Sequence, residues 1–209
     1  MEQSSRHFLI YRFSALGDVA IAAPLIKYYA SNNPNDRFTI VTQAKLSPLF
    51  KGVDNLHVYA VDTKKQHKGL MGLWRLSREL LRLKPTHVAD IHSVLRTHIL
   101  RKYHLLNRLK YQIIDKGREE KKILTKDKDK RVYQLKTSMA RYEDVLVRLG
   151  LDNLSFSDKK ISLSRRQKIE SSNKFVVGIA PFAKHKGKEW PVDKMDKLIE
   201  KLSLTSNIN

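Results

Sequence analysis

The chain has 209 residues, with 41 Lys and Arg against 21 Asp and Glu, and it contains no cysteine. This length suffices for one full domain and part of a second. The lack of cysteine excludes disulfides and thiolate metal sites, so the cytosol is the expected compartment. No apolar run approaches the ~20 residues of a membrane span, and the N-terminus lacks the apolar core of a signal peptide.

The positive charge is concentrated between residues 64 and 131, which hold 20 Lys and Arg but only 7 Asp and Glu. A field of this sign attracts polyanions such as nucleic acid, anionic lipid or a phosphorylated glycolipid. Within this region, residues 116–131 alternate acidic and basic side chains, which is typical of a solvated surface. Charge alone therefore leaves the partner open.

The N-terminal stretch from His7 to Pro24 predicts a strand, a turn and a helix. The apolar run at 8–11 is short enough for a strand buried on both faces, and a small polar turn at 14–18 precedes a largely apolar helix. This order places the turn at the carboxyl end of a parallel strand, where open α/β sheets bind ligands. Asp18 falls at the helix start, where a carboxylate serves as a cap, a base or both.

Strands and helices continue to alternate as far as residue 150, which indicates an α/β fold with a doubly wound parallel sheet. Further strands are expected at residues 37–42, 56–61, 86–92 and 110–115, and helices at residues 46–50, 70–83 and 133–149. The helix at 70–83 is predicted to turn five apolar side chains inward, Leu70, Leu73, Trp74, Leu80 and Leu81. Another of its faces carries Arg75, Arg78 and Arg82.

The composition changes after residue 150. Residues 151–173 are rich in Ser, Asp and Lys and are expected to link a first domain at 1–150 to a second that begins at 174. In the second, a strand at 174–181 and a basic loop precede a helix whose inward positions are predicted to be Met195, Leu198, Ile199 and Leu202. A domain of this type needs on the order of 100 residues, so the second one is expected to be truncated.

Three segments of the chain resemble glycosyltransferase family 9, the ADP-heptose:lipopolysaccharide heptosyltransferases. That family opens with a strand, a basic residue, a Ser-rich turn, Gly-Asp and a later proline, which are matched here by Arg12, Ser14, Gly17, Asp18 and Pro24. VVGIAPFAKHKGKEWPVDKMDKLIEKL, residues 176–202, is similar to the head of the family's nucleotide domain. LKTSMARYEDVLVRLG, residues 135–150, is similar to its connecting helix. The resemblance implies a Rossmann-like acceptor domain of the GT-B type and the start of a second Rossmann-like domain.

The resemblance also implies an activity, the inverting transfer of a heptose from ADP-heptose to the inner core of lipopolysaccharide. It makes Asp18 the general base and Lys188 a contact of the donor diphosphate, with charge added by Lys184 and Lys186. The implied acceptor contacts are Arg12, Ser14, Gly17, Asp90, His92, Ser93 and Arg96. Taken alone, His92 is better explained as a hydrogen-bonded structural residue, and with the resemblance the two interpretations are equally supported. Such an enzyme works in the cytoplasm, in peripheral contact with the inner membrane.

No cofactor or metal is expected, because direct displacement needs no enzyme nucleophile and the eight histidines lack the spacing of metal ligands. A nicotinamide-binding domain would need Gly-x-Gly-x-x-Gly, and the turn at 14–18 has one glycine. A nucleic-acid-binding protein would explain the net charge and stays the weaker alternative, but a nucleic-acid partner is not expected, because the basic region is not interleaved with aromatic residues. A remnant that only binds anionic glycolipid stays open, since a truncated chain is expected to transfer little sugar.

Overall fold

The structure is a computed structural model that describes residues 5–104, 107–126, 133–151, 156, 177–183 and 186–204. The chain divides into two compact units, Met1–Lys160 and Ile161–Asn209. Much of the expected linker at 151–173 lies outside the described residues. None of the helices that the described residues form is long and apolar enough to cross a bilayer.

The first unit is built on a five-stranded sheet in the order β3-β2-β1-β4-β5, in which every pairing is parallel. The strands are β1 (His7–Tyr11), β2 (Arg37–Thr42), β3 (Leu56–Ala60), β4 (His87–Asp90) and β5 (Lys110–Ile113). The five predicted strands and the doubly wound parallel sheet are thus confirmed. Because Tyr11 is in register with Val41 of β2 and Asp90 of β4, the carboxyl ends of the central strands meet at one edge.

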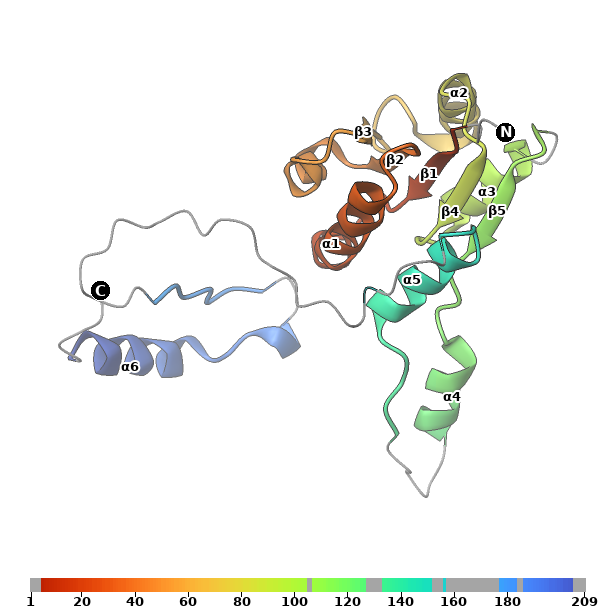
Figure 1. Ribbon diagram of the computed structural model, residues 1–209. Coiled ribbons are helices and arrows are strands. Elements are labelled where there is room, and N and C mark those ends of the chain that lie inside the picture. Colours follow the sequence, from red (N-terminus) through yellow and green to blue (C-terminus); the bar gives the residue numbers. More distant parts are fainter. Residues whose placement is uncertain are drawn as a thin grey trace. The chain divides into compact units, whose positions relative to one another are not determined.

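Helices cover both faces of this sheet (Figure 1). They are α1 (Leu16–Asn32) and α5 (Ser138–Val147) on one face and α2 (Gly69–Arg82) and α3 (Leu95–His104) on the other, with a 3-10 helix, η1, at Ala44–Phe50. Helix α4 (Arg118–Lys126) projects away from the sheet. Phe8 and Ile10 of β1 pack in one apolar cluster with side chains of α1 and α5. Leu9 and Tyr11 pack in a second cluster with side chains of α2 and α3. Because β1 is packed on both faces, its position is fixed, and so is the start of the turn that follows it.

The inner face of α2 differs from the sequence-based prediction. Its buried residues are Gly72, Leu73, Leu76, Ser77 and Leu80, whereas Leu70 and Trp74 are exposed. The prediction was wrong for those two side chains because the first turn of α2 lies directly against the preceding loop. A Cβ atom on Gly72 would lie 2.5 Å from the backbone carbon of His67, so this contact sets the rotation of the helix.

Helix α5 begins five residues later than predicted. Thr137 caps it, because the Thr137 side chain accepts a hydrogen bond from the backbone N–H of Ala140 at 3.2 Å. Tyr142 and Leu146 are buried as predicted, and Gly150 lies just beyond the end of the helix. The N-terminus of α5 therefore lies beside Lys136 and Thr137, at the site described below.

The described part of the second unit consists of a 3-10 turn, η3 (Lys186–Lys188), and the helix α6 (Val192–Ser203). Of the strand predicted at 174–181, residues 174–176 lie outside the described residues, and residues 177–181 form no strand. A strand needs a hydrogen-bonded neighbour, and the described residues of this unit provide none. Leu198 and Ile199 of α6 are exposed, in contrast to the inward positions predicted for them. The described residues of this unit offer no second layer to cover that face.

Candidate functional site

The residues that follow β1 form the base of the site. Arg12 is buried, and its Nη1 donates a hydrogen bond to the carbonyl oxygen of Ile91 at 2.9 Å. The centre of its guanidinium lies 5.6 Å from the centroid of the Tyr142 ring, a cation–π contact. Its Nη2 forms an ion pair with Oδ2 of Asp18. These contacts tie the end of β1, the end of β4, α5 and α1 together at one point.

Asp18 is the third residue of α1, whose N-cap residue is Ala15. This position lies within the first turn, where the helix dipole favours a carboxylate. Its side chain is 45% exposed. Among the residues that the structure describes, none donates a hydrogen bond to Oδ1, so this oxygen is open to a ligand. Gly17 adds to this openness, because a Cβ atom at that position would meet nothing within 4 Å.

Asp18 faces a cleft of about 500 Å³. The cleft is lined by Arg12, Ser14, Ala15, Asp18, His92, Val94, Ile114, Lys116, Lys121, Lys136, Thr137, Ser138, Arg141 and Tyr142. Five of these residues are basic, and Asp18 is the one acidic residue among them. Two of the cations are compensated nearby, Lys136 by Asp144 and Arg141 by Glu120. The cleft therefore combines one carboxylate with an excess of positive charge, an arrangement that attracts anions.

Lys116 is a partly buried cation of the cleft. Its Nζ donates a hydrogen bond to the carbonyl oxygen of Ser93 at 2.8 Å. The pKa of Lys116 is lowered, first by burial and then by the charges of Arg118 and Arg12. An anion bound here would offset this repulsion.

The turn after β4 is shaped by Asp90. Its carboxylate is buried, and Oδ1 accepts hydrogen bonds from the backbone N–H groups of His92 at 3.0 Å and Ser93 at 2.7 Å. These bonds hold a turn in which Ser93 has a φ of 45°. Asp90 is not among the residues that line the cleft.

His92 lines the cleft and is buried. Burial, followed by the charges of Arg12 and Lys116, lowers the pKa of His92 to about 4, so the imidazole is neutral at neutral pH. Its Nδ1 atom is buried and has no hydrogen-bond partner among the described residues.

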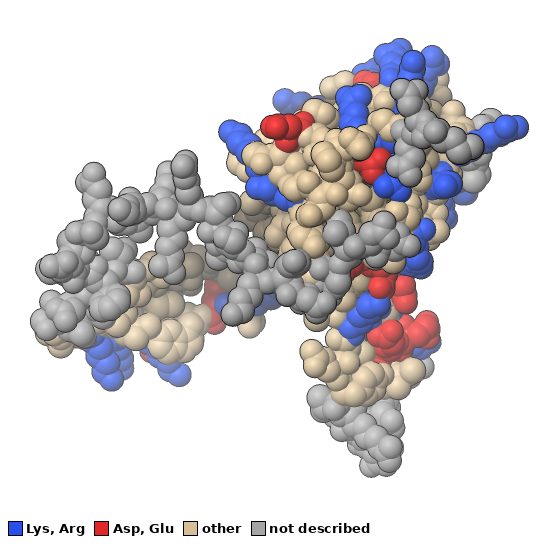
Figure 2. Space-filling model, viewed as in Figure 1, with Lys and Arg blue, Asp and Glu red and all other residues tan. Residues whose placement is uncertain are grey.

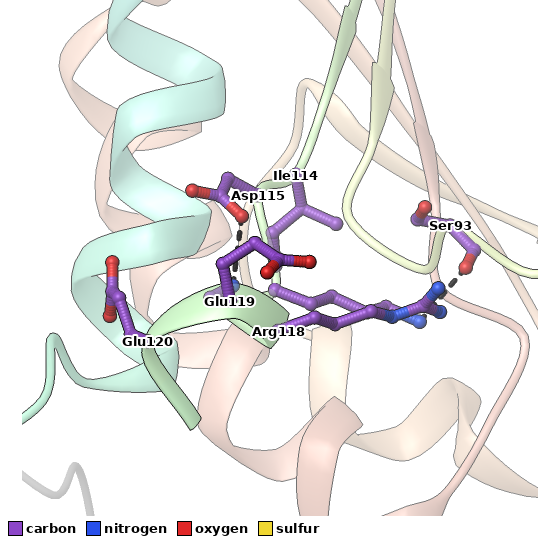
Figure 3. A pocket seen from close by; sticks show the side chains of 8 residues that line it. Ser93, Ile114, Asp115, Arg118, Glu119 and Glu120 are labelled. Carbon is purple, nitrogen blue, oxygen red and sulfur yellow. Dashed lines mark hydrogen bonds between the residues drawn. The ribbon is translucent and has the colours of Figure 1, made fainter. Parts of the chain in front are cut away.

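The structure brings four of the predicted site residues together in the cleft, namely Arg12, Ser14, Asp18 and His92. Ser93 lines an adjoining hollow of about 290 Å³ that shares Ile114 and Lys116 with the cleft. Figure 3 shows this hollow with Ser93 on one side and Asp115 and Glu119 on the other. Arg96 is exposed on α3 and lines neither space. In the second unit, Lys186 and Lys188 are exposed on η3, and Lys184 lies outside the described residues.

Sequence reasoning missed a group of cleft residues that follow β5 or begin α5, namely Lys116, Lys121, Lys136, Thr137, Ser138, Arg141 and Tyr142. The charge pattern of residues 116–131 predicts a solvated surface, and the apolar spacing after residue 133 predicts a helix that packs on the sheet. One signal was available. Lys116 follows a predicted parallel strand, and the carboxyl ends of such strands line ligand sites. Within the described residues, no group of His, Asp and Glu side chains could hold a metal ion.

Comparisons with protein-family models and with curated proteins find no match. Solved structures do match. The family 9 glycosyltransferase of Veillonella parvula aligns with a TM-score of 0.66 and 20% identity, over 95% of this chain and 60% of that one. The E. coli heptosyltransferase WaaC aligns with TM-scores of 0.63 in its complex with ADP-2-deoxy-2-fluoro heptose and 0.61 in its complex with ADP. The chain has the fold of these glycosyltransferases.

Identity to the two WaaC structures is 15% and 16%, and 97% of this chain aligns with each. The chain spans about 60 to 67% of the length of these neighbours. The likeness confirms the predicted GT-B type of fold, with its Rossmann-like sheet.

Proposed function

We propose that this chain is the acceptor-binding part of an inverting glycosyltransferase, which transfers a heptose from ADP-heptose to the inner core of lipopolysaccharide. The observation that carries the proposal is Asp18, a partly exposed carboxylate held by Arg12 in a cleft whose other charged residues are all basic. The fold that the chain shares with WaaC, which has been solved with ADP and with a fluorinated ADP-heptose, supports the choice of donor.

The cleft favours an anionic acceptor. Lys116 and Lys121 form no ion pair with a described carboxylate, and the N-terminus of α5 beside Thr137 adds N–H groups that attract anions. A phosphorylated or carboxylated sugar satisfies both features, whereas a neutral sugar leaves the cations without a partner. An inner-core lipopolysaccharide has the required charge.

In the proposed reaction, Oδ1 of Asp18 takes the proton from an acceptor hydroxyl while the hydroxyl oxygen forms its bond to the anomeric carbon of the heptose. The bond from that carbon to the diphosphate oxygen breaks, and ADP leaves with the electron pair. Arg12 keeps the carboxylate in place throughout. The attack occurs from the side opposite the leaving group, so the configuration inverts and no covalent enzyme intermediate forms.

The leaving diphosphate carries the charge that develops as the bond breaks. We assign its stabilisation to Lys188 and Lys186 of η3, with Lys184 as a further candidate. These side chains precede α6, whose first N–H groups would also attract phosphate. Lys188→Ala is expected to weaken the binding of ADP. The matched control is Lys194→Ala on α6, which should bind ADP as the unaltered protein does.

A second candidate function is the binding of anionic glycolipid without sugar transfer. It is favoured by Lys116 and Lys121 in the cleft, which attract an anionic ligand whether or not sugar transfer follows. The two functions share the cleft and differ in whether ADP is released.

The test combines transfer with binding. The protein is incubated with ADP-heptose and a lipopolysaccharide core that lacks heptose, and both ADP release and the mass of the glycolipid are measured. Transfer that is lost in Asp18→Asn and kept in Asp54→Asn, an exposed aspartate outside the cleft, supports the enzyme. Salt-sensitive glycolipid binding without ADP release supports the binding function. If neither occurs, the proposed function is wrong.

A further inference from the structure

Four apolar side chains of α2 and α3 surround a shallow hollow of about 340 Å³ on the surface of the first unit. They are Leu70, Met71, Trp74 and Tyr103, here called the apolar patch. Leu70 is 66% exposed, Met71 71% and Trp74 46%. Soluble proteins seldom expose several large apolar side chains side by side without a partner for them.

The same surface is strongly basic. The outer side of α2 continues from Trp74 to Arg75, Arg78 and Arg82, which are all exposed, and the guanidinium of Arg78 lies 5.2 Å from the Trp74 ring centroid. The loop before α2 adds Lys64, Lys65 and Lys68, and α3 adds Arg101 and Lys102 without any acidic residue. Figure 2 shows Lys and Arg side chains gathered at the top of the first unit, where Figure 1 places α2.

A hydrogen-bond network fixes the start of α2, so the apolar patch is held outward. Asp62 donates its backbone N–H to Nδ1 of His67 at 3.1 Å, which leaves Nε2 of that buried histidine to donate to Glu79 at 3.0 Å. The Tyr59 hydroxyl donates to the same carboxylate. Glu79, the one acidic residue of α2, is thereby committed within the protein and does little to offset the basic surface.

We propose that the apolar patch and the arginines beside it dock on an anionic lipid bilayer, with Leu70, Met71 and Trp74 entering the interfacial region and Arg75, Arg78 and Lys102 binding the headgroups. Aliphatic and indole side chains favour this depth, and basic side chains next to them favour anionic lipids. The inference stands on this surface alone and does not depend on the sugar-transfer function.

The charges favour a bilayer over a second copy of the chain. In a two-fold dimer the same patch faces itself, so the arginines and lysines around it would meet an equal set of cations. A bilayer that contains phosphatidylglycerol presents apolar chains beneath negative headgroups, which matches both parts of the surface.

The first experiment measures binding to vesicles of phosphatidylglycerol mixed with phosphatidylcholine, and to vesicles of phosphatidylcholine alone. The unaltered protein is expected to bind the anionic vesicles and to detach as salt is added. The double variant L70S/M71S is expected to lose about tenfold or more in affinity. Arg78→Gln is expected to lose about fivefold. The matched control is F182S/L204S, which removes two exposed apolar side chains from the other unit and should bind as the unaltered protein does.

The second experiment reports depth. The chain has two tryptophans, so Trp190→Phe leaves Trp74 as the single fluorophore. Its emission is expected to shift to shorter wavelength on anionic vesicles and to be quenched by lipids brominated on their acyl chains. If Trp74 is not quenched, or if L70S/M71S binds as tightly as its control, the membrane site is wrong. It is also wrong if L70S/M71S abolishes a dimer seen by sedimentation without weakening vesicle binding. Circular dichroism and melting curves establish that each variant folds.

Discussion

Arg12 and Asp18 form an ion pair in which the guanidinium is buried and the carboxylate is open to solvent, with side-chain exposures of 8% and 45%. Arg12 is held independently by the Ile91 carbonyl oxygen and by the ring of Tyr142. Asp18 is thus oriented by a fixed partner without being desolvated. A carboxylate that accepts a proton from a bound hydroxyl needs both properties, a defined position and an open oxygen.

Asp18→Asn is expected to lower turnover by about 10²–10⁴-fold, because the amide cannot accept the proton. Asparagine keeps the size of the side chain, and the exposed half of the ion pair contributes only ~1 kcal/mol or less to stability. The melting temperature and acceptor affinity should therefore change little. Steady-state kinetics and a melting curve on the same preparation check this. Turnover close to normal would show that Asp18 only stabilises the N-terminus of α1 and that another residue is the general base.

Arg12→Gln is expected to lower turnover by about tenfold or more, because the carboxylate loses the partner that orients it. The double variant with Asp18→Asn should be no slower than Asp18→Asn alone, since Arg12 acts through the carboxylate. Single-turnover rates of the unaltered protein, the two single variants and the double variant form a double-mutant cycle. If the two effects multiply, Arg12 acts on the substrate directly. Arg12→Lys is a useful additional variant. Lysine keeps the positive charge, but its ammonium group cannot bind the Ile91 carbonyl oxygen and the Asp18 carboxylate together, as the planar guanidinium does.

The sequence was most informative where local pattern and burial agree. The β1 strand was predictable because four consecutive apolar residues precede a small polar turn, and the structure buries all of that run. The place of Asp18 followed from the same stretch, since a helix after a parallel strand begins at the carboxyl edge of the sheet. Arg12, Ser14 and His92 also reach the cleft from strand ends that the sequence identified.

The remainder depends on contacts between distant segments. Lys116 and Arg141 reach the cleft from the segments after β5 and in α5. The position of Lys116 after a parallel strand was a signal for this role, whereas nothing in the local sequence distinguishes Arg141 from a solvated cation. The rotation of α2 depends on the contact of Gly72 with the His67 backbone, which the helical period of the apolar residues does not encode. The hydrogen bonds that Asp90 accepts from the backbone of His92 and Ser93 likewise could not be read from the sequence, and its role as an acceptor contact, which the resemblance implies, stays a prediction.

Gly117→Ala is expected to displace Arg141 and to destabilise the protein. A Cβ atom on Gly117 would lie 2.3 Å from Nη2 of Arg141, and the glycine has a φ of 58°. That guanidinium donates to Glu120 at 2.5 Å and to the Asp115 carbonyl oxygen at 3.3 Å, so it joins α5 to α4 and to the end of β5. The loss in unfolding free energy should be about 2–4 kcal/mol, from backbone strain and overpacking together.

Gly52→Ala is the matched control for this substitution. Gly52 has a φ of 87°, but a Cβ atom there meets nothing within 4 Å, so only backbone strain of about 1 kcal/mol is expected. Urea unfolding of both variants separates strain from the clash with Arg141. Equal losses would show that Arg141 moves aside freely and that its contacts contribute little. Acceptor binding should weaken in Gly117→Ala alone.

Stability is expected to fall between pH 6.5 and pH 4, in part because of His92. Burial, aided by Arg12 and Lys116, lowers the pKa of His92 to about 4 in the folded protein, against an ordinary value of 6.5. Between these values the unfolded chain binds the proton and the folded chain does not, so protonation favours unfolding. The contribution of His92 is intact above pH 6.5 and is lost as the pH falls toward 4, by on the order of 2 kcal/mol near pH 4.5. Of the other charges acting on the ring, Arg96 also lowers this pKa, whereas Asp18 raises it.

The measurement is the free energy of unfolding in urea at pH 7 and pH 4.5, for the unaltered protein and for His92→Gln. The variant cannot gain the proton, so its difference between the two pH values should be smaller by the contribution of His92. Other buried histidines contribute equally to the pH dependence of both proteins. One of them is His104, whose pKa is also lowered to about 4 by burial. Titration of the His92 ring by NMR gives its pKa directly. A ring that titrates near 6.5, together with equal pH dependence in the two proteins, would show that water or an ion reaches the imidazole in the folded state.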